Sequence, residues 1–163
     1  MPPLENPREG YPFYASFGHV HFIDNYKVIV VSDKNKVSVY TLGTSYWIRI
    51  EDIPYSHCIF GPGVFVSGNV NWLASDDSSI LSLDLEKESY QQLLLPNSEN
   101  NLRLLDVLRD CLCIFASSDL FLDVWIMKEY GKQESWTKLY SVPNMLDRDC
   151  KAYKALYISE DDQ

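Results

Sequence analysis

A repeated pattern of short strand-like segments, with a period of about 44 residues, most constrains how this 163-residue chain folds. Each copy predicts an alternating strand, a turn, a second strand led by an aromatic residue, and then a proline. The leading aromatic residues are Trp47, Tyr90 and Trp136, which are 43 and 46 positions apart, and a proline follows them after 7, 6 and 7 positions. The predicted hairpins pair residues 37–40 with 47–50, 81–85 with 90–93, and 122–126 with 136–139.

A second series of apolar segments keeps the same period and precedes each hairpin. These segments are residues 26–31, 70–73, 112–115 and 155–158, centred near 28, 72, 114 and 157, which gives steps of 44, 42 and 43. Side chains alternate with period 2 inside the segments, as a β-strand requires. Three or four short strands in about 44 residues match one blade of a β-propeller. The sequence therefore predicts an all-β chain of stacked blades, with the leading aromatic residues packed between them, because one blade cannot bury its own apolar faces.

Two segments also carry spacing that suits a helix. In residues 102–108 the leucines at 104, 105 and 108 fall on one helical face, and residues 145–156 show similar spacing. The register of the repeat favours strands in both places, and we expect strands there.

Net charge, apolar runs and cysteine content limit the kinds of partner and the cellular compartment that we expect for this protein. The net charge is −9 and there is no run of basic residues, so binding to nucleic acid or to an anionic membrane is disfavoured. No apolar run approaches the ~20 residues of a membrane span, and the first residues do not resemble a signal peptide. The four cysteines show no framework spacing, and Cys111 and Cys113 share an apolar run that predicts buried free thiols, so a cytoplasmic or nuclear location is expected.

Several short patterns resemble parts of functional sites, but each has a simpler structural explanation. They are Gly61 to Gly63 with Gly68, His19 with His21, His57 with Cys58, Asp76 with Asp77, and residues 86–88. The glycines lack the Lys-Ser/Thr of a phosphate loop and predict a turn into a strand. The two imidazoles are expected on one strand face without further ligands, and adjacent residues such as His57 and Cys58 point to opposite faces. The acidic groups predict polar turns. We therefore expect no catalytic residue, no cofactor and no metal site.

Residues 123–140 have the sequence DVWIMKEYGKQESWTKLY. They resemble "vWvMkeYG..eSWtKly", the most diagnostic pattern of the plant F-box-associated interaction domain, and three further stretches are similar to the same family. Residues 60–73, FGPGVFVSGNVNWL, and residues 80–88, ILSLDLEKE, resemble the pattern that begins "fvnGalhWl", and residues 24–29 resemble "dDYKVv". The residues that we assign to the structural family motif are Trp47, Gly68, Trp72, Asp84, Trp125, Tyr130, Gly131 and Trp136.

The resemblance implies both a fold and a function. The fold is a kelch-like β-propeller, here incomplete, with three to four blades of short antiparallel strands. The function is that of the substrate-recruiting part of an SCF-type ubiquitin ligase, in which partner subunits carry out the ubiquitin chemistry and the protein itself is not an enzyme. The implied partners are a target protein, a Skp-type adaptor and a cullin. Target-binding residues are expected in loops between strands, at 43–46, 75–79, 86–89, 97–101 and 130–135.

The domain boundaries follow from the matched stretches. Residues 1–16 form a proline-rich segment whose four prolines, at 2, 3, 7 and 12, do not suit the helices of an F-box. Residues 17–163 form the interaction domain, which we expect to be truncated at both ends, and this leaves docking to the adaptor open. Two alternatives remain: a product without an F-box that acts as a competitor or has no function, and a propeller that binds a sugar or another small molecule.

Overall fold

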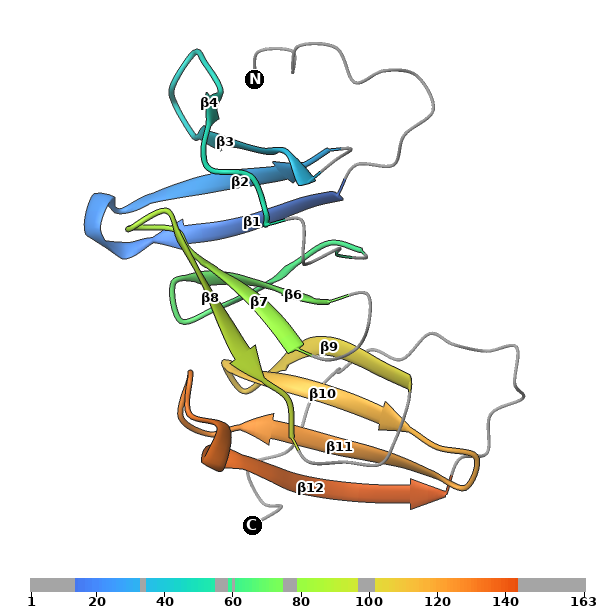
Figure 1. The fold of residues 1–163 in the computed structure, drawn as a ribbon. Helices are drawn as coiled ribbons and strands as arrows, with labels where there is room; N and C mark the ends of the chain where they lie inside the picture. The colour runs from blue at the N-terminus through green and yellow to red at the C-terminus, as the bar shows by residue number, and fades with distance from the viewer. Residues whose placement is uncertain are drawn as a thin grey trace. The chain divides into compact units, whose positions relative to one another are not determined.

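The computed structural model describes residues 14–32, 35–54, 59, 61–74, 79–96 and 102–143, which form three four-stranded antiparallel sheets (Figure 1). The first sheet contains, in order, β1 (Tyr14–Val20), β2 (Asn25–Val31), β3 (Val37–Thr41) and β4 (Ile48–Arg49). The second contains β5 (Val64–Val66), β6 (Asn69–Leu73), β7 (Ser79–Asp84) and β8 (Ser89–Leu94). The third contains β9 (Leu102–Leu108), β10 (Cys111–Ser117), β11 (Phe121–Met127) and β12 (Trp136–Pro143).

The all-β prediction is confirmed, and most predicted strands are found. The apolar segments correspond to β2, β6 and β10, and the predicted hairpins to β3–β4, β7–β8 and β11–β12. Residues 102–108 form strand β9. The register of the repeat predicted this strand, whereas the spacing of the leucines alone would have suited a helix. The predictions for residues 145–156 and 155–158, and the proline-rich segment up to residue 13, lie outside the described residues. Each described sheet has the four strands of a propeller blade.

The chain divides into two compact units, residues 1–92 and 93–163, so the boundary falls within β8. In the first unit, one face of the first sheet packs against one face of the second sheet. The residues that build this core include Ile29, Val31 and Val39 from the first sheet and Trp72, Leu81 and Leu83 from the second. Period-2 alternation in β2 and β7 places these side chains on one face of each strand.

Two residues on the inner face of the first sheet depart from its apolar pattern. Lys27 lies in the middle of β2 and is buried, and Gly18 is its direct partner on β1. The Lys27 ammonium donates to the Leu85 carbonyl at 2.8 Å and to Glu88 Oε1 at 3.0 Å, both at the β7–β8 turn. These contacts fasten the end of the β7–β8 hairpin to the first sheet.

The second unit has its own core, formed by the third sheet. Leu108, Cys113, Val124 and Ile126 are buried together, and Cys111, Phe115 and Leu139 pack against them. Cys111 and Cys113 are both free thiols, and burial, with smaller contributions from Asp106 and Cys111, raises the pKa of Cys113 to about 12. The Cys113 thiol is therefore an unreactive part of the core.

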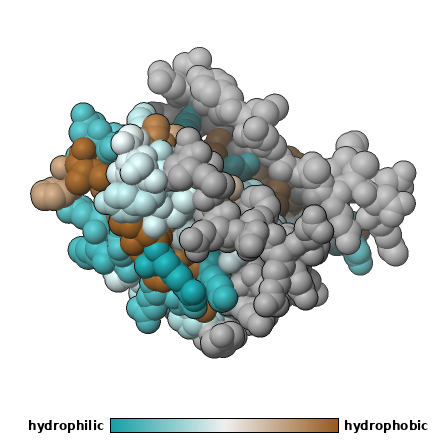
Figure 2. Space-filling view, turned by 90° about the horizontal axis from the view of Figure 1, so that it is seen from above, coloured by the Kyte–Doolittle hydropathy of each residue, from teal (hydrophilic) through white to brown (hydrophobic). Residues whose placement is uncertain are grey.

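The surface of the molecule is mixed in polarity. Brown hydrophobic areas lie beside teal hydrophilic ones on the face that Figure 2 shows. On the first sheet, Phe17 and Tyr26 are stacked at 4.9 Å between ring centroids and are both exposed. Within the described ranges, no helix has the length and apolar character needed to cross a membrane.

Candidate functional site

The patterns examined for catalysis or metal binding lie in different settings. The expectation of His19 and His21 on one strand is wrong at His21, because β1 ends at Val20 and His21 begins the 3₁₀ turn η1 (His21–Ile23). Their rings nevertheless meet edge to face at 4.8 Å. Residues 57, 58, 76 and 77 lie outside the described residues. Among the described residues there is no group of three or more His, Cys, Asp or Glu arranged to hold a metal ion.

Four residues of the predicted family motif lie in the first unit: Trp47, Gly68, Trp72 and Asp84. Gly68 has a φ of +79° and follows Ser67, with φ of +51°, in the two-residue turn between β5 and β6. Such a turn needs positive φ at both positions, which glycine adopts without strain. Trp72 on β6 is fully buried in the core, and Trp47 lies just before β4, with its ring 5.3 Å from that of Tyr40.

Asp84 shapes the turn that connects β7 to β8. Its Oδ1 accepts hydrogen bonds from the backbone N–H groups of Glu86 and Lys87, both at 2.9 Å, and its Oδ2 lies 3.3 Å from the Lys87 ammonium. Burial alone would raise the pKa of Asp84, but the two backbone N–H groups and the Lys87 charge outweigh it, and the pKa lies below its ordinary value. The carboxylate therefore stabilises the turn in its ionised form.

The lowered pKa of Asp84 predicts a pH dependence of stability. Above the unfolded-state pKa of about 3.9 its contribution is fully present, and it is lost as the pH falls through the lower folded-state pKa. We expect Asp84→Asn to reduce the free energy of unfolding by about 1 kcal/mol at pH 7. The difference from the wild type should shrink below pH ~4. Chemical denaturation followed by fluorescence from pH 7 to pH 3 checks this, with Glu86→Gln on the same turn as the control.

The loop between β11 and β12 is ordered by the hydroxyl of Ser135. The hydroxyl oxygen lies 2.9 and 2.7 Å from the carbonyl oxygens of Glu129 and Lys132, which share its single proton, and it accepts from the Glu129 N–H at 3.1 Å. Gly131 has a φ of +83°, and its N–H donates to the sulfur of Met127. The short turn η3 (Gln133–Ser135) then leads directly into Trp136. The "YG..eSW" part of the sequence pattern therefore builds one compact loop.

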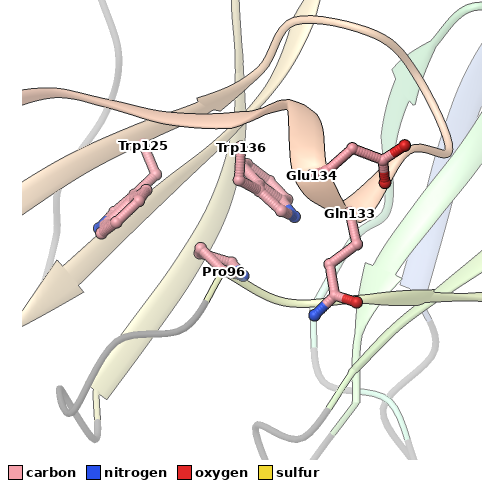
Figure 3. Close-up of a pocket in the computed structure, with 5 residues that line it drawn as sticks. All are labelled: Pro96, Trp125, Gln133, Glu134 and Trp136. Carbon is pink, nitrogen blue, oxygen red and sulfur yellow. The ribbon is translucent and has the colours of Figure 1, made fainter.

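An open pocket of about 370 Å³ lies beside this loop, within the second unit. It is lined by Pro96, Trp125, Gln133, Glu134 and Trp136. Figure 3 shows Trp136 between Trp125 on one side and Gln133 and Glu134 on the other, with Pro96 next to Trp136. The pocket thus has two indole rings and a proline as apolar surfaces, and an amide and a carboxylate as polar groups.

Hydrogen bonds to backbone carbonyls at the end of β8 fix the side chains of two residues that line the pocket. Trp136 Nε1 donates to the Leu94 carbonyl at 3.0 Å, and Gln133 Nε2 donates to the Leu95 carbonyl at 3.5 Å. Trp136 is itself buried, so its ring is fixed in position.

The other indole of the pocket lies next to an irregularity in the sheet, where Leu139 on β12 is the extra residue. The register of β11 and β12 shifts between Val124 and Trp125, which marks a β-bulge, and Trp125 then pairs with Lys138. The Lys138 ammonium lies 5.1 Å from the centre of the Trp125 ring and forms an ion pair with Asp123 at 2.8 Å. Bulges often redirect a side chain next to a binding site.

Sequence reasoning anticipated only part of this pocket. Trp125 and Trp136 were expected as structural motif residues, and residues 130–135, which include Gln133 and Glu134, as a candidate target-binding loop. Pro96 was not singled out as lining a site. The available signal was the proline that follows each leading aromatic residue, which places Pro96 after β8. Of the other candidate loops, residues 43–46 and 86–88 form turns, and residues 75–78 and 97–101 lie outside the described part of the chain.

Comparison with known proteins decides the family. The protein-family model described as "F-box associated beta propeller domain" matches residues 5–163 of this chain. The chain belongs to this family. Membership agrees with the blade-like sheets and with the resemblance in the "vWvMkeYG..eSWtKly" stretch, and it makes the β11–β12 loop and its pocket features of an F-box associated domain.

Several curated proteins of Arabidopsis thaliana are similar to this F-box associated domain. F-box protein CPR1 is 27% identical, and the match covers 82% of this chain and 41% of that protein. F-box/kelch-repeat protein At3g23880 is 28% identical, covering 80% of this chain and 40% of its own. F-box protein At4g22390 is 29% identical, covering 82% and 41%. The chain thus spans about two fifths of the length of these curated relatives.

Proposed function

We propose that this protein recruits a target protein to an SCF-type ubiquitin ligase, with partner subunits transferring the ubiquitin. The observation that carries the proposal is the family match over residues 5–163, together with relatives that are named F-box proteins. The pocket beside the β11–β12 loop supports it, because exposed surface around tryptophan is typical of protein interfaces. The proposal extends to a Skp-type adaptor and a cullin as partners.

We also propose that the protein acts in the cytoplasm, the nucleus or both. The support is the spacing of the four cysteines, at positions 58, 111, 113 and 150, which does not match a disulfide framework, together with the buried free thiol of Cys113. Reduced thiols in this arrangement fit a reducing compartment.

The proposal is tested by the fate of the target when the protein is removed. Targets are identified by cross-linking and mass spectrometry with the tagged chain, and their half-lives are then measured with and without the gene. A recruiting subunit predicts that the target is degraded more slowly, by a factor of about three or more, and accumulates when the gene is deleted.

The alternative, a competitor that shields the target, predicts the opposite result, with faster loss of the target after deletion. An unchanged half-life for every cross-linked protein would contradict both ideas. Re-expression of the wild-type chain is the control, and it should restore the original half-life.

A further inference from the structure

The pocket beside the β11–β12 loop combines two indole rings with a carboxylate that forms no ion pair with any described residue. Its two larger walls are the rings of Trp125 and Trp136, and the Trp136 ring is fixed by its hydrogen bond to Leu94. Glu134 is exposed and forms no ion pair with any of the described residues. A carboxylate beside indole rings is the arrangement that attracts a cation.

The neighbouring lysines form their ion pairs with other carboxylates, and Glu134 acts on Lys132 only as a smaller contribution beside Glu129. Lys132 pairs with Glu129 in the same loop, and Lys138, whose ammonium lies over one face of the Trp125 ring, pairs with Asp123. Both lysines are thus matched by their own acidic partners. The Trp136 ring and the other face of Trp125 remain for a ligand. The protein as a whole carries a net charge of −9, which favours the approach of a basic partner.

We propose that this pocket binds an arginine side chain of the target protein. A guanidinium group is planar and stacks on an indole ring, while its N–H groups reach a carboxylate such as that of Glu134. The inference rests on the proposed function, since it names the chemistry by which the target is recognised.

The pocket is less suited to a proline-rich segment. Recognition of such a segment uses aromatic rings with N–H donors for the ligand's carbonyl groups. Here the Trp136 N–H is already bonded to Leu94, and the Trp125 N–H is buried. The pocket therefore offers ring faces and a carboxylate, which suit a cation.

The direct test uses peptides and the indole N–H signals of the protein. A short glycine- and serine-based peptide with one central arginine is titrated into the ¹⁵N-labelled chain, and its citrulline counterpart provides the same shape without the charge. The chain has four tryptophans, so the indole signals are few and can be assigned with Trp→Phe variants. We expect the arginine peptide to shift the Trp125 and Trp136 signals, to leave Trp47 and Trp72 unchanged, and to bind more tightly than the citrulline peptide.

A charge-neutralising variant sharpens the test. Glu134→Gln should weaken binding of the arginine peptide about fivefold or more, because the cation loses its counter-charge. Glu86→Gln is the matched control: Glu86 is also exposed, its substitution changes the net charge equally, and it does not line the pocket. Both positions are at the surface, so both variants are expected to fold, and unchanged Trp72 signals verify this.

The outcomes separate this inference from the function on which it rests. Equal binding of the arginine and citrulline peptides, no movement of the Trp125 and Trp136 signals, or a stronger response to a proline-rich peptide would each overturn the arginine pocket. If target half-lives still lengthen on gene deletion, the recruiting function stands without it. If the peptide results hold while half-lives do not change, the pocket stands and the recruiting function fails.

Discussion

Replacing Lys27 by methionine is expected to lower the free energy of unfolding by about 2–3 kcal/mol. Methionine preserves much of the length and apolar volume of the lysine side chain but cannot donate hydrogen bonds. The Leu85 carbonyl would lose its buried 2.8 Å hydrogen bond, and Glu88 would lose its ion pair. A buried carbonyl without a donor is costly because water does not replace the lost partner. Chemical denaturation followed by circular dichroism measures the effect.

The ion pair and the hydrogen bond to Leu85 can be separated. Glu88→Gln keeps an acceptor for the Lys27 ammonium and leaves the bond to Leu85 intact. Glu88 is also partly exposed, so this variant should cost less than about 1 kcal/mol. Wild-type stability in Lys27→Met would mean that apolar packing alone holds the hairpin against the first sheet.

Gly18→Ala is the second substitution with a large expected effect, a loss of about 2–3 kcal/mol. A methyl group at Gly18 would lie 2.4 Å from Phe65 Cδ2 and 2.8 Å from Leu85 Cδ1, far inside van der Waals contact. Leu85 is buried, and the closest contact involves the aromatic ring of Phe65, so relief requires the sheets to move. Thermal and urea unfolding of the variant measure the cost.

A double mutant tests whether the cause is this contact. Phe65→Leu removes the ring edge nearest to Gly18, so it should be less destabilising in the Gly18→Ala background than in the wild type. Ala15→Val is the control on the same strand, because Ala15 is exposed and should tolerate the larger side chain. Additive effects of Gly18→Ala and Phe65→Leu would assign the instability to the strand itself and not to the contact.

Local pattern was enough to predict most of the sheet structure. Period-2 alternation and the period of about 44 residues identified the strands that became β2, β6 and β10, and they favoured a strand for β9 over a helix. The pattern misled at β4, predicted as residues 47–50 but formed by only Ile48 and Arg49. Ladder length depends on the backbone of the neighbouring strand, which the residues of one segment do not specify.

The roles of Lys27, Gly18 and Glu134 could not be predicted, because they depend on contacts distant in sequence. Alternation placed Lys27 on the same face as Ile29. It did not indicate that the carbonyl of Leu85, 58 residues away, accepts the hydrogen bond of the Lys27 ammonium. Position 18 must be glycine because the ring of Phe65 leaves no room for a side chain. The pocket depends on the Leu94 carbonyl at the end of β8, which accepts the hydrogen bond that fixes the Trp136 ring. Sequence pattern indicates which face a residue occupies, whereas its partner follows only from tertiary packing.

Each sheet is built from strands that are consecutive in the chain, and this bears on folding during synthesis. Contacts between successive strands close short loops, so a sheet can form as soon as its four strands have left the ribosome. The inner face of the first sheet is a different case, because its partners on β6 and β7 are made later. Between the synthesis of β4 and that of β7, the nascent chain exposes this apolar face, and during that interval the face is a binding site for a chaperone that recognises apolar surface.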